Sequence, residues 1–195
     1  YDKDNLAAED WKGINIRIES QGPGRDKTSI QYFISEKIKD DFDIIFNDDG
    51  SGDAAELIAM REESKDSILV RLVHCKFSSE DEPGARISDI YELCGQAQKS
   101  IKWKHCGMAS FIGHIKRRET QWQSVGHSRF IKGNSKDLIK LKKKARYSKI
   151  IFEILIVQPG LSKSKVSEDI LQLLGGADLY LKKTADATFA VITSK

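Results

Sequence analysis

The sequence predicts an α/β fold in which helices flank a mixed β-sheet. Segments 55–61 and 68–76 are rich in apolar and β-branched residues and are separated by a short polar turn, which is typical of a β-hairpin. A helical pattern follows at 87–101, and the nearly continuous apolar run 150–157 is typical of a strand covered on both faces. A hairpin followed by helix-linked strands indicates a mixed sheet with helices on its faces.

The composition is that of one folded domain. The chain has 195 residues, of which 39% are apolar and 31% are charged, with a net charge of +3. A folded chain of this length buries roughly 70% of the surface that its unfolded state exposes. No apolar run approaches the roughly 18 residues of a membrane span, and no N-terminal segment resembles a signal peptide. Because the chain begins at Tyr1 rather than at a methionine, we expect it to be a piece of a longer protein.

The N-terminal elements are predicted from alternation and from capping. Residues 13–19 alternate between apolar and polar, which favours a strand or an extended arm. Thr28 and Gln31 have the spacing of a capping box, and apolar residues at helical intervals predict a helix over about 28–39. A short β-rich run at 42–46 then precedes a turn cluster.

The C-terminal elements are delimited by glycine and proline. Pro159 and Gly160 are expected to end the strand 150–157. Apolar residues over 166–174 predict a helix, which we expect the Gly175-Gly176 pair to stop, and 188–193 is a last β-rich run. The overall order is therefore αβββα, an insertion, and βαβ.

Positive charge is concentrated in the insertion. Residues 115–149 contain twelve Lys or Arg and two acids, a net charge of +10, whereas the rest of the chain carries 20 basic and 27 acidic side chains, a net −7. We expect one domain over 1–195, with a core of about 28–104 and 150–193. A basic insertion spans about 105–149, and we expect its residues 115–149 to project from the sheet.

Such asymmetry favours a polyanion-binding segment, although a solvated lysine-rich loop has the same composition. Trp122, Phe130 and Tyr147 interleave with the charges and are suited to stacking on bases. The candidate nucleic-acid-binding residues are Lys116, Arg117, Arg118, Lys132, Lys142, Lys143, Lys144 and Arg146.

The cysteines indicate a reducing compartment. Cys75, Cys94 and Cys106 are odd in number and widely spaced, so they form no disulfide framework. We therefore expect a cytoplasmic protein.

The hairpin brings together side chains that suit phosphodiester chemistry. Side chains alternate along a strand, so His74 and Lys76 share one face. In an in-register hairpin Glu56 lies opposite both of them, beside the acidic turn 48–53. Carboxylates suit Mg²⁺, which prefers oxygen ligands, and a metal ion can activate water for hydrolysis. The lysine can stabilise negative charge that develops on the phosphorus centre.

This arrangement resembles the PD-(D/E)XK nuclease superfamily, which has the restriction-endonuclease-like fold. The matching text is DAAELIA at 53–59 followed by VHCK at 73–76. The family has a metal-binding acid on its second strand and an acid-any-lysine tripeptide at the end of its third. The αβββαβ order also matches, over roughly 28–157.

The resemblance implies a role for each residue of the hairpin site. Glu56 takes the place of the metal-binding acid, with Asp53 as its rival, and Lys76 takes the place of the catalytic lysine. The backbone carbonyl of Cys75 would complete the metal shell. His74 departs from the pattern because the family usually has Asp or Glu there, and histidine is a softer ligand for Mg²⁺ than a carboxylate. The departure implies a weaker metal site, a preference for Mn²⁺, or a domain that only binds.

The family often places a polar residue of the following helix at the site, and we assign this place to Gln98. At 100° per residue Gln98 falls on the apolar face of 87–101, whereas Gln96 and Glu92 fall on the opposite side. Gln98 either reaches the substrate phosphate or a metal-bound water, or it is a helix-edge residue satisfied by the backbone.

The expected function is nucleic-acid hydrolysis that depends on Mg²⁺ or Mn²⁺, with DNA as the favoured substrate. Analogy suggests a cytoplasmic restriction or antiviral defence protein that also carries a helicase or NTPase domain. The alternative is a nucleic-acid-binding or interaction module that kept the fold and lost the chemistry. The sequence leaves open RNA as a substrate and a homodimer.

Overall fold

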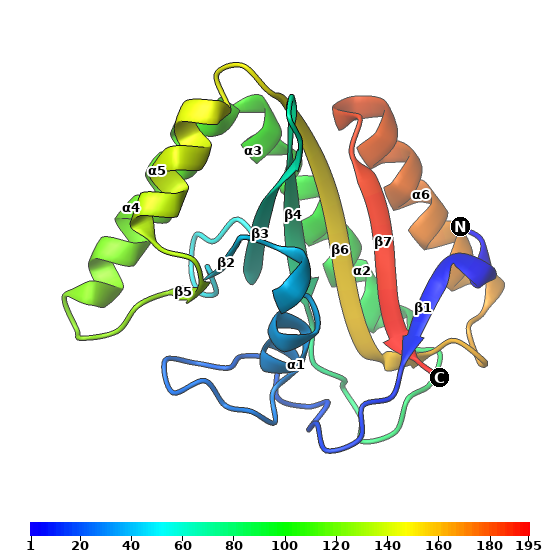
Figure 1. The fold of residues 1–195 in the computed structure, drawn as a ribbon. Coiled ribbons are helices and arrows are strands. Elements are labelled where there is room, and N and C mark those ends of the chain that lie inside the picture. Colours follow the sequence, from blue (N-terminus) through cyan, green and yellow to red (C-terminus); the bar gives the residue numbers. More distant parts are fainter.

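A seven-stranded mixed sheet with helices on both faces forms the centre of the computed structural model, which describes residues 1–195 (Figure 1). The strand order is β1-β7-β6-β4-β3-β2-β5. The predicted α/β class is therefore confirmed. None of the helices is long and apolar enough to cross a membrane.

The strands are β1 (Leu6–Glu9), β2 (Ile44–Asn47), β3 (Leu57–Ser64), β4 (Ser67–Cys75), β5 (Phe130–Lys132), β6 (Lys149–Ser162) and β7 (Thr188–Ser194). The α-helices are α1 (Ile30–Lys37), α2 (Ile87–Lys99), α3 (Ile101–His105), α4 (Gly107–Gln123), α5 (Ser135–Lys144) and α6 (Glu168–Ala185). Two short 3₁₀ helices lie at Lys3–Asn5 and Lys39–Asp41.

The sheet is antiparallel on one side and parallel on the other. β2, β3 and β4 form an antiparallel meander, in which β3 and β4 are the predicted hairpin. α2 then leads to β6, which pairs with β4 in parallel, and α6 leads to β7, which pairs with β6 in parallel. The larger core lies between the sheet and α2, α4, α5 and α6, while α1 packs against the smaller core on the opposite face (Figure 1).

The basic segment does not project from the sheet, contrary to expectation. β5 pairs with β2 and forms one edge of the sheet. Phe111, Ile112 and Ile115 of α4 and Leu138 and Leu141 of α5 are buried in the larger core. These apolar residues recur at helical spacing between the charges, so each helix has one face that must be buried.

Residues 13–19, expected to be a strand or an extended arm, do not form a strand. The segment runs through turns, with the Ile14 amide bonded to the Trp11 carbonyl and the Ile18 amide to the Asn15 carbonyl. Ile14 and Ile16 pack against the smaller core, which explains the alternation without a strand. The strand of this region is β1, which is only four residues long.

Two predicted stops near the C-terminus do not occur. β6 continues past Pro159 and Gly160 to Ser162, because Gly84 pairs with its last residues. The Gly84 amide donates to the Gly160 carbonyl, and the Gly84 carbonyl accepts the Ser162 amide. α6 continues through Gly175 and Gly176 to Ala185. Its buried residues Leu174, Ala177, Leu181 and Ala185 keep the helical period, and their burial outweighs a cost of about 1 kcal/mol for each glycine.

Candidate functional site

The start of β3 and the end of β4 meet at one end of the sheet. Leu57 pairs with Val73, so Glu56 lies beside His74, as an in-register hairpin predicted. Glu56 Oε2 lies 3.1 Å from His74 Nδ1 and accepts the Cys75 amide at 3.2 Å. Both side chains are buried. The antiparallel register alone brings these two side chains together.

Lys76 follows β4 at the same end of the sheet. Its Nζ lies 2.7 Å from Glu92 Oε1 on α2 and 5.0 Å from the centre of the Phe77 ring. Partial burial lowers the pKa of Lys76, but the hydrogen bond to Glu92 and the charges of Glu19 and Glu56 outweigh it and raise the pKa. Lys76 is therefore a charged group beside the carboxylates.

Further carboxylates gather around Glu56. Burial, followed by the charge of Glu56, raises the pKa of Glu19 to about 7 and that of Asp53 to about 6. Asp49 raises both pKa values further and is held by Ser20 Oγ at 2.5 Å. Glu19, Asp49, Asp53 and Glu56 therefore form an acidic cluster at this end of the sheet.

Sequence reasoning missed Glu19 altogether. It lies in the turn segment that precedes α1, where its Oε2 accepts the Phe77 amide at 3.2 Å. No local pattern marks this residue, because a contact across 58 residues places it at the site.

His74 is engaged through both ring nitrogens. Its Nε2 lies 2.6 Å from Ser100 Oγ, while its Nδ1 lies beside Glu56. A metal ion at either nitrogen would have to displace one of these protein partners. The arrangement suits a histidine that holds Glu56 in place better than it suits a metal ligand.

A small polar cavity of about 60 Å³ lies beside Glu56, His74 and Ser100 and is also lined by Asp53 and Gln96. The cavity has room for water, and most of its lining residues are polar. The cavity is therefore a space of solvent size next to the carboxylates.

The structure places Gln96, rather than the predicted Gln98, at this cavity. Gln98 is half-buried and does not line it. The buried face of α2 includes Leu93, whereas Ile87 and Tyr91 are 37% and 61% exposed. The buried face is therefore rotated away from Gln98 relative to the predicted stripe.

No group of three or more His, Cys, Asp or Glu side chains lies close enough to hold a metal ion directly. The donor chemistry nevertheless fits Mg²⁺ or Mn²⁺, because Glu19, Asp53 and Glu56 offer carboxylate oxygens, the ligands that these ions prefer. Burial, followed by the charge of Glu56, raises the pKa of the Cys75 thiol, so that its side chain stays a protonated thiol. Of the two groups of Cys75, the thiol and the backbone carbonyl, only the carbonyl therefore remains a candidate metal ligand.

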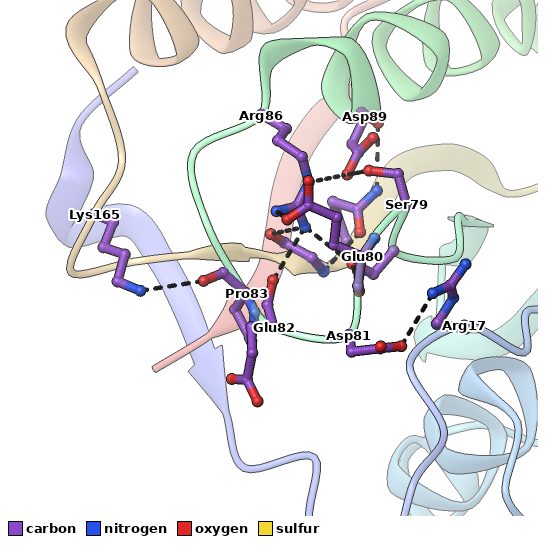
Figure 2. Close-up of polar contacts among 12 residues, drawn as sticks. Arg17, Ser79, Glu80, Asp81, Glu82, Pro83, Arg86, Asp89 and Lys165 are labelled. Carbon is purple, nitrogen blue, oxygen red and sulfur yellow. Dashed lines mark hydrogen bonds and ion pairs between the residues drawn. The ribbon is translucent and has the colours of Figure 1, made fainter.

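The loop that follows Lys76 is fixed by Arg86 (Figure 2). The Arg86 guanidinium donates to Ser78 Oγ at 3.0 Å, to Glu80 at 3.0 Å and to Asp89 at 3.2 Å, and also to the Glu82 and Gly160 carbonyls. These bonds tie the loop to α2 and to β6. They restrict the backbone that leads out of Lys76.

The predicted basic residues divide into separate groups. Lys116 and Arg117 of α4 are exposed, but Arg118 is buried and bonds the loop after β2 through Asp48 and Ser51. Arg118 therefore has a structural partner instead of a free guanidinium. Lys132 donates to the Lys39 carbonyl at 2.6 Å and lies on the edge strand β5.

The lysine run of α5 lies at the opposite end of the sheet. Lys144 bonds Glu62 and the Ser64 carbonyl in the β3–β4 hairpin. Glu62 is six residues along the strand from Glu56, about 20 Å at about 3.3 Å per residue. Lys142, Lys143 and Lys144 thus lie far from the carboxylates, and Arg146 is exposed just beyond α5.

The chain matches no protein-family model, no curated protein and no solved structure.

Proposed function

We propose that this protein hydrolyses phosphodiester bonds of nucleic acid, with DNA as the favoured substrate, in the presence of Mg²⁺ or Mn²⁺. The observation that carries the proposal is the acidic cluster at the end of β4, next to the ammonium group of Lys76. Burial, followed by repulsion from the Glu56 carboxylate, raises the pKa of Glu19 and of Asp53, and a divalent cation would relieve that repulsion. This combination of charges suits a scissile phosphate and its metal ion.

In this proposal Glu56 and Asp53 hold the metal ion, together with the carbonyl of Cys75. A bound Mg²⁺ supplies a Lewis acid that polarises phosphoryl oxygens and water. Lys76 stabilises the negative charge that develops on the phosphoryl oxygens. His74 keeps Glu56 oriented through the 3.1 Å contact at Nδ1, and Glu92 holds the Lys76 ammonium until the substrate phosphate competes for it.

The order of the elements supports the restriction-endonuclease-like resemblance. The meander β2–β3–β4, the crossover helix α2 and the parallel strand β6 follow the αβββαβ order that the sequence predicts after α1. We further propose a cytoplasmic restriction or antiviral defence setting beside a helicase or NTPase domain, by analogy with that family.

The deciding experiment incubates the protein with linear, circular and single-stranded DNA and with RNA, in Mg²⁺, Mn²⁺ or EDTA. We expect cleavage with a divalent ion and none in EDTA. Glu56→Gln is the matched control, since an amide keeps the bonds to His74 and Cys75 but removes the charge. Cleavage at the wild-type rate by Glu56→Gln, or none by the wild type, would contradict the proposal.

A second candidate is a module that binds nucleic acid without cleaving it. The engagement of both His74 nitrogens favours it, because no free nitrogen remains in the place of the family's second acid. Calorimetric titration with Mn²⁺ separates the candidates. A binding module would retain its affinity for DNA in EDTA and would release no heat with Mn²⁺.

A further inference from the structure

Asp48 is fully buried just after β2 and contacts two basic side chains of α4. Its Oδ1 lies 2.8 Å from Arg118 Nε, and its Oδ2 lies 2.7 Å from His114 Nε2. Oδ2 also accepts the Ala54 amide at 2.7 Å. One carboxylate therefore joins α4 to both ends of the loop 48–54.

Arg118 and Arg129 hold the backbone of the same loop. Arg118 donates to the Ser51 carbonyl at 2.8 Å and to the Asp49 carbonyl at 3.0 Å, and also to the Asp48 carbonyl. Arg129 donates to the Asn47 carbonyl at 2.9 Å and to the Asp49 carbonyl at 3.0 Å. Two guanidinium groups thus bind the backbone carbonyls of residues 47, 48, 49 and 51.

The loop needs such support because of its composition. Gly50 and Gly52 have φ angles of 116° and 80°, which are accessible to glycine and confer no rigidity of their own. The loop carries Asp49 and Asp53 and leads into Glu56, whose carbonyl accepts the Asp48 amide at 3.0 Å. The relative position of the carboxylates therefore depends on what holds the loop.

We propose that Asp48, Arg118 and His114 form a positioning clamp that fixes Asp53 and Glu56 relative to each other for binding of the divalent metal ion. The inference rests on the proposed function. In this proposal the three residues hold the loop and act on the ion only through Asp53 and Glu56. Groups that orient metal ligands in this way typically contribute about 10–100-fold to metal affinity.

The test compares Arg118→Lys with Arg61→Lys in the full chain. Lysine keeps the charge at position 118 but loses the planar group that bonds Asp48 and the carbonyls together. Arg61 also binds a carbonyl, that of Asp41, and lies near the far end of β3, so it is a matched control. Mn²⁺ affinity is measured by calorimetry, and exchange of the Ala54 and Ile154 amides by NMR.

We expect Arg118→Lys to weaken Mn²⁺ binding at least about tenfold and to speed exchange at Ala54 but not at Ile154 in β6. Arg61→Lys should leave all three quantities unchanged. In an Asp53→Asn background, Arg118→Lys should add little, because both changes act on the same ligand.

Three results would overturn the clamp. The first is wild-type Mn²⁺ affinity in Arg118→Lys, and the second is faster exchange at Ile154 as well, which would show a general loss of structure. The third is full additivity with Asp53→Asn. If the wild type itself does not bind Mn²⁺, the proposed function fails and the clamp with it; if only the variant comparison fails, the proposed function stands.

Discussion

Lys76 is the residue on which the nuclease proposal depends most directly. Lys76→Ala should lower the cleavage rate on the order of 10²–10³-fold, the size seen when one preorganised transition-state donor is removed. The fold should lose little, since the partly exposed pair with Glu92 contributes about 0–1 kcal/mol. Cleavage rate in Mn²⁺ and melting temperature are measured together.

The exposed Lys140→Ala, on α5, serves as the control for Lys76→Ala. A double variant of Lys76→Ala with Glu56→Ala should be little worse than either single change, because groups that act as one unit are not additive. Wild-type cleavage by Lys76→Ala would remove this residue from the chemistry.

Glu19 gives the site a distinct pH dependence. Its pKa is raised from 4.5 to about 7 by burial and by Glu56, so the folded state binds more protons than the unfolded state between these values. The free energy of unfolding therefore falls as pH rises from about 4.5 to about 7 and stays low above that range. Glu19→Gln should remove this decline and stabilise the protein at pH 8 by about 1–2 kcal/mol, allowing for solvent screening.

Denaturant unfolding of wild type and Glu19→Gln at several pH values, without divalent ions, checks the expectation. Glu36→Gln is a suitable control, because Glu36 lies on α1 outside the acidic cluster and pairs with Lys39 at the surface. Parallel pH curves for wild type and Glu19→Gln would show that Glu19 titrates normally.

At the scale of single residues, the sequence predicts the contacts between side chains that the register of one hairpin brings together, and few others. Glu56 and His74 follow from alternation along a hairpin. Glu19 and Ser100 do not, because they reach the site from distant segments whose position depends on the folded core. For Arg118 the prediction was wrong in the opposite direction. Its charge indicated contact with nucleic acid at the surface, but its side chain is buried and paired with Asp48.

At the scale of elements, the lysines of α5 are expected to contact DNA away from the acidic cluster. Lys142 and Lys143 neighbour Lys144, which bonds Glu62, and Glu62 lies about 20 Å along β3 from Glu56, or about six base pairs at about 3.4 Å each. Changing both to alanine should lower the salt slope by about 0.9 per lost phosphate contact for long duplexes. Hairpin substrates with stems of about six base pairs should bind unchanged. Fluorescence anisotropy over a salt series measures both.

The matched control changes Lys182 and Lys183 of α6, an adjacent exposed pair on another helix. Equal loss of slope in both double variants would mean that α5 has no particular role. An unchanged slope in the Lys142 and Lys143 variant would mean that these lysines are merely solvated.

α6 offers a test of the fold that is independent of function. A methyl group on Gly176 would meet no atom within 4 Å, and the residue lies inside the helix. Gly176→Ala should therefore stabilise the protein by about 0.5–1 kcal/mol. Gly52→Ala, at a φ of 80°, should destabilise it. Thermal unfolding of both variants checks the sign of each change.

Elements with a clear apolar period were predictable, and those covered by charge were not. The hairpin, α2 and the last strand follow from their own residues. α4 and α5 carry so many cations that their short apolar stripes were obscured. α6 outlasts its glycine pair because of buried contacts with the rest of the molecule, and no local signal reports these.

For the whole molecule, metal binding and stability should be linked. A ligand that binds only the folded state at about 100 times its Kd stabilises it by about 2.7 kcal/mol. For a chain of this length each kcal/mol shifts Tm by about 2–4 °C, so saturating Mn²⁺ should raise Tm by about 5–11 °C. Glu56→Gln should abolish the Tm shift. The Tm of each protein in EDTA, without divalent ions, gives the baseline. An equal shift in both proteins would place the ion elsewhere.

The pairing of β1 with β7 sets an order of assembly. Leu6 pairs with Val191, a contact that spans 185 residues, whereas the β3–β4 hairpin closes through a turn of a few residues. Contacts of long sequence separation form late, because their loop-closure entropy must be overcome before they stabilise the chain. Glu19 lies between β1 and α1, so we expect the N-terminal arm to dock onto a meander that already holds Glu56 and Lys76. The nascent chain would then carry an incomplete set of carboxylates until its two most distant strands have met.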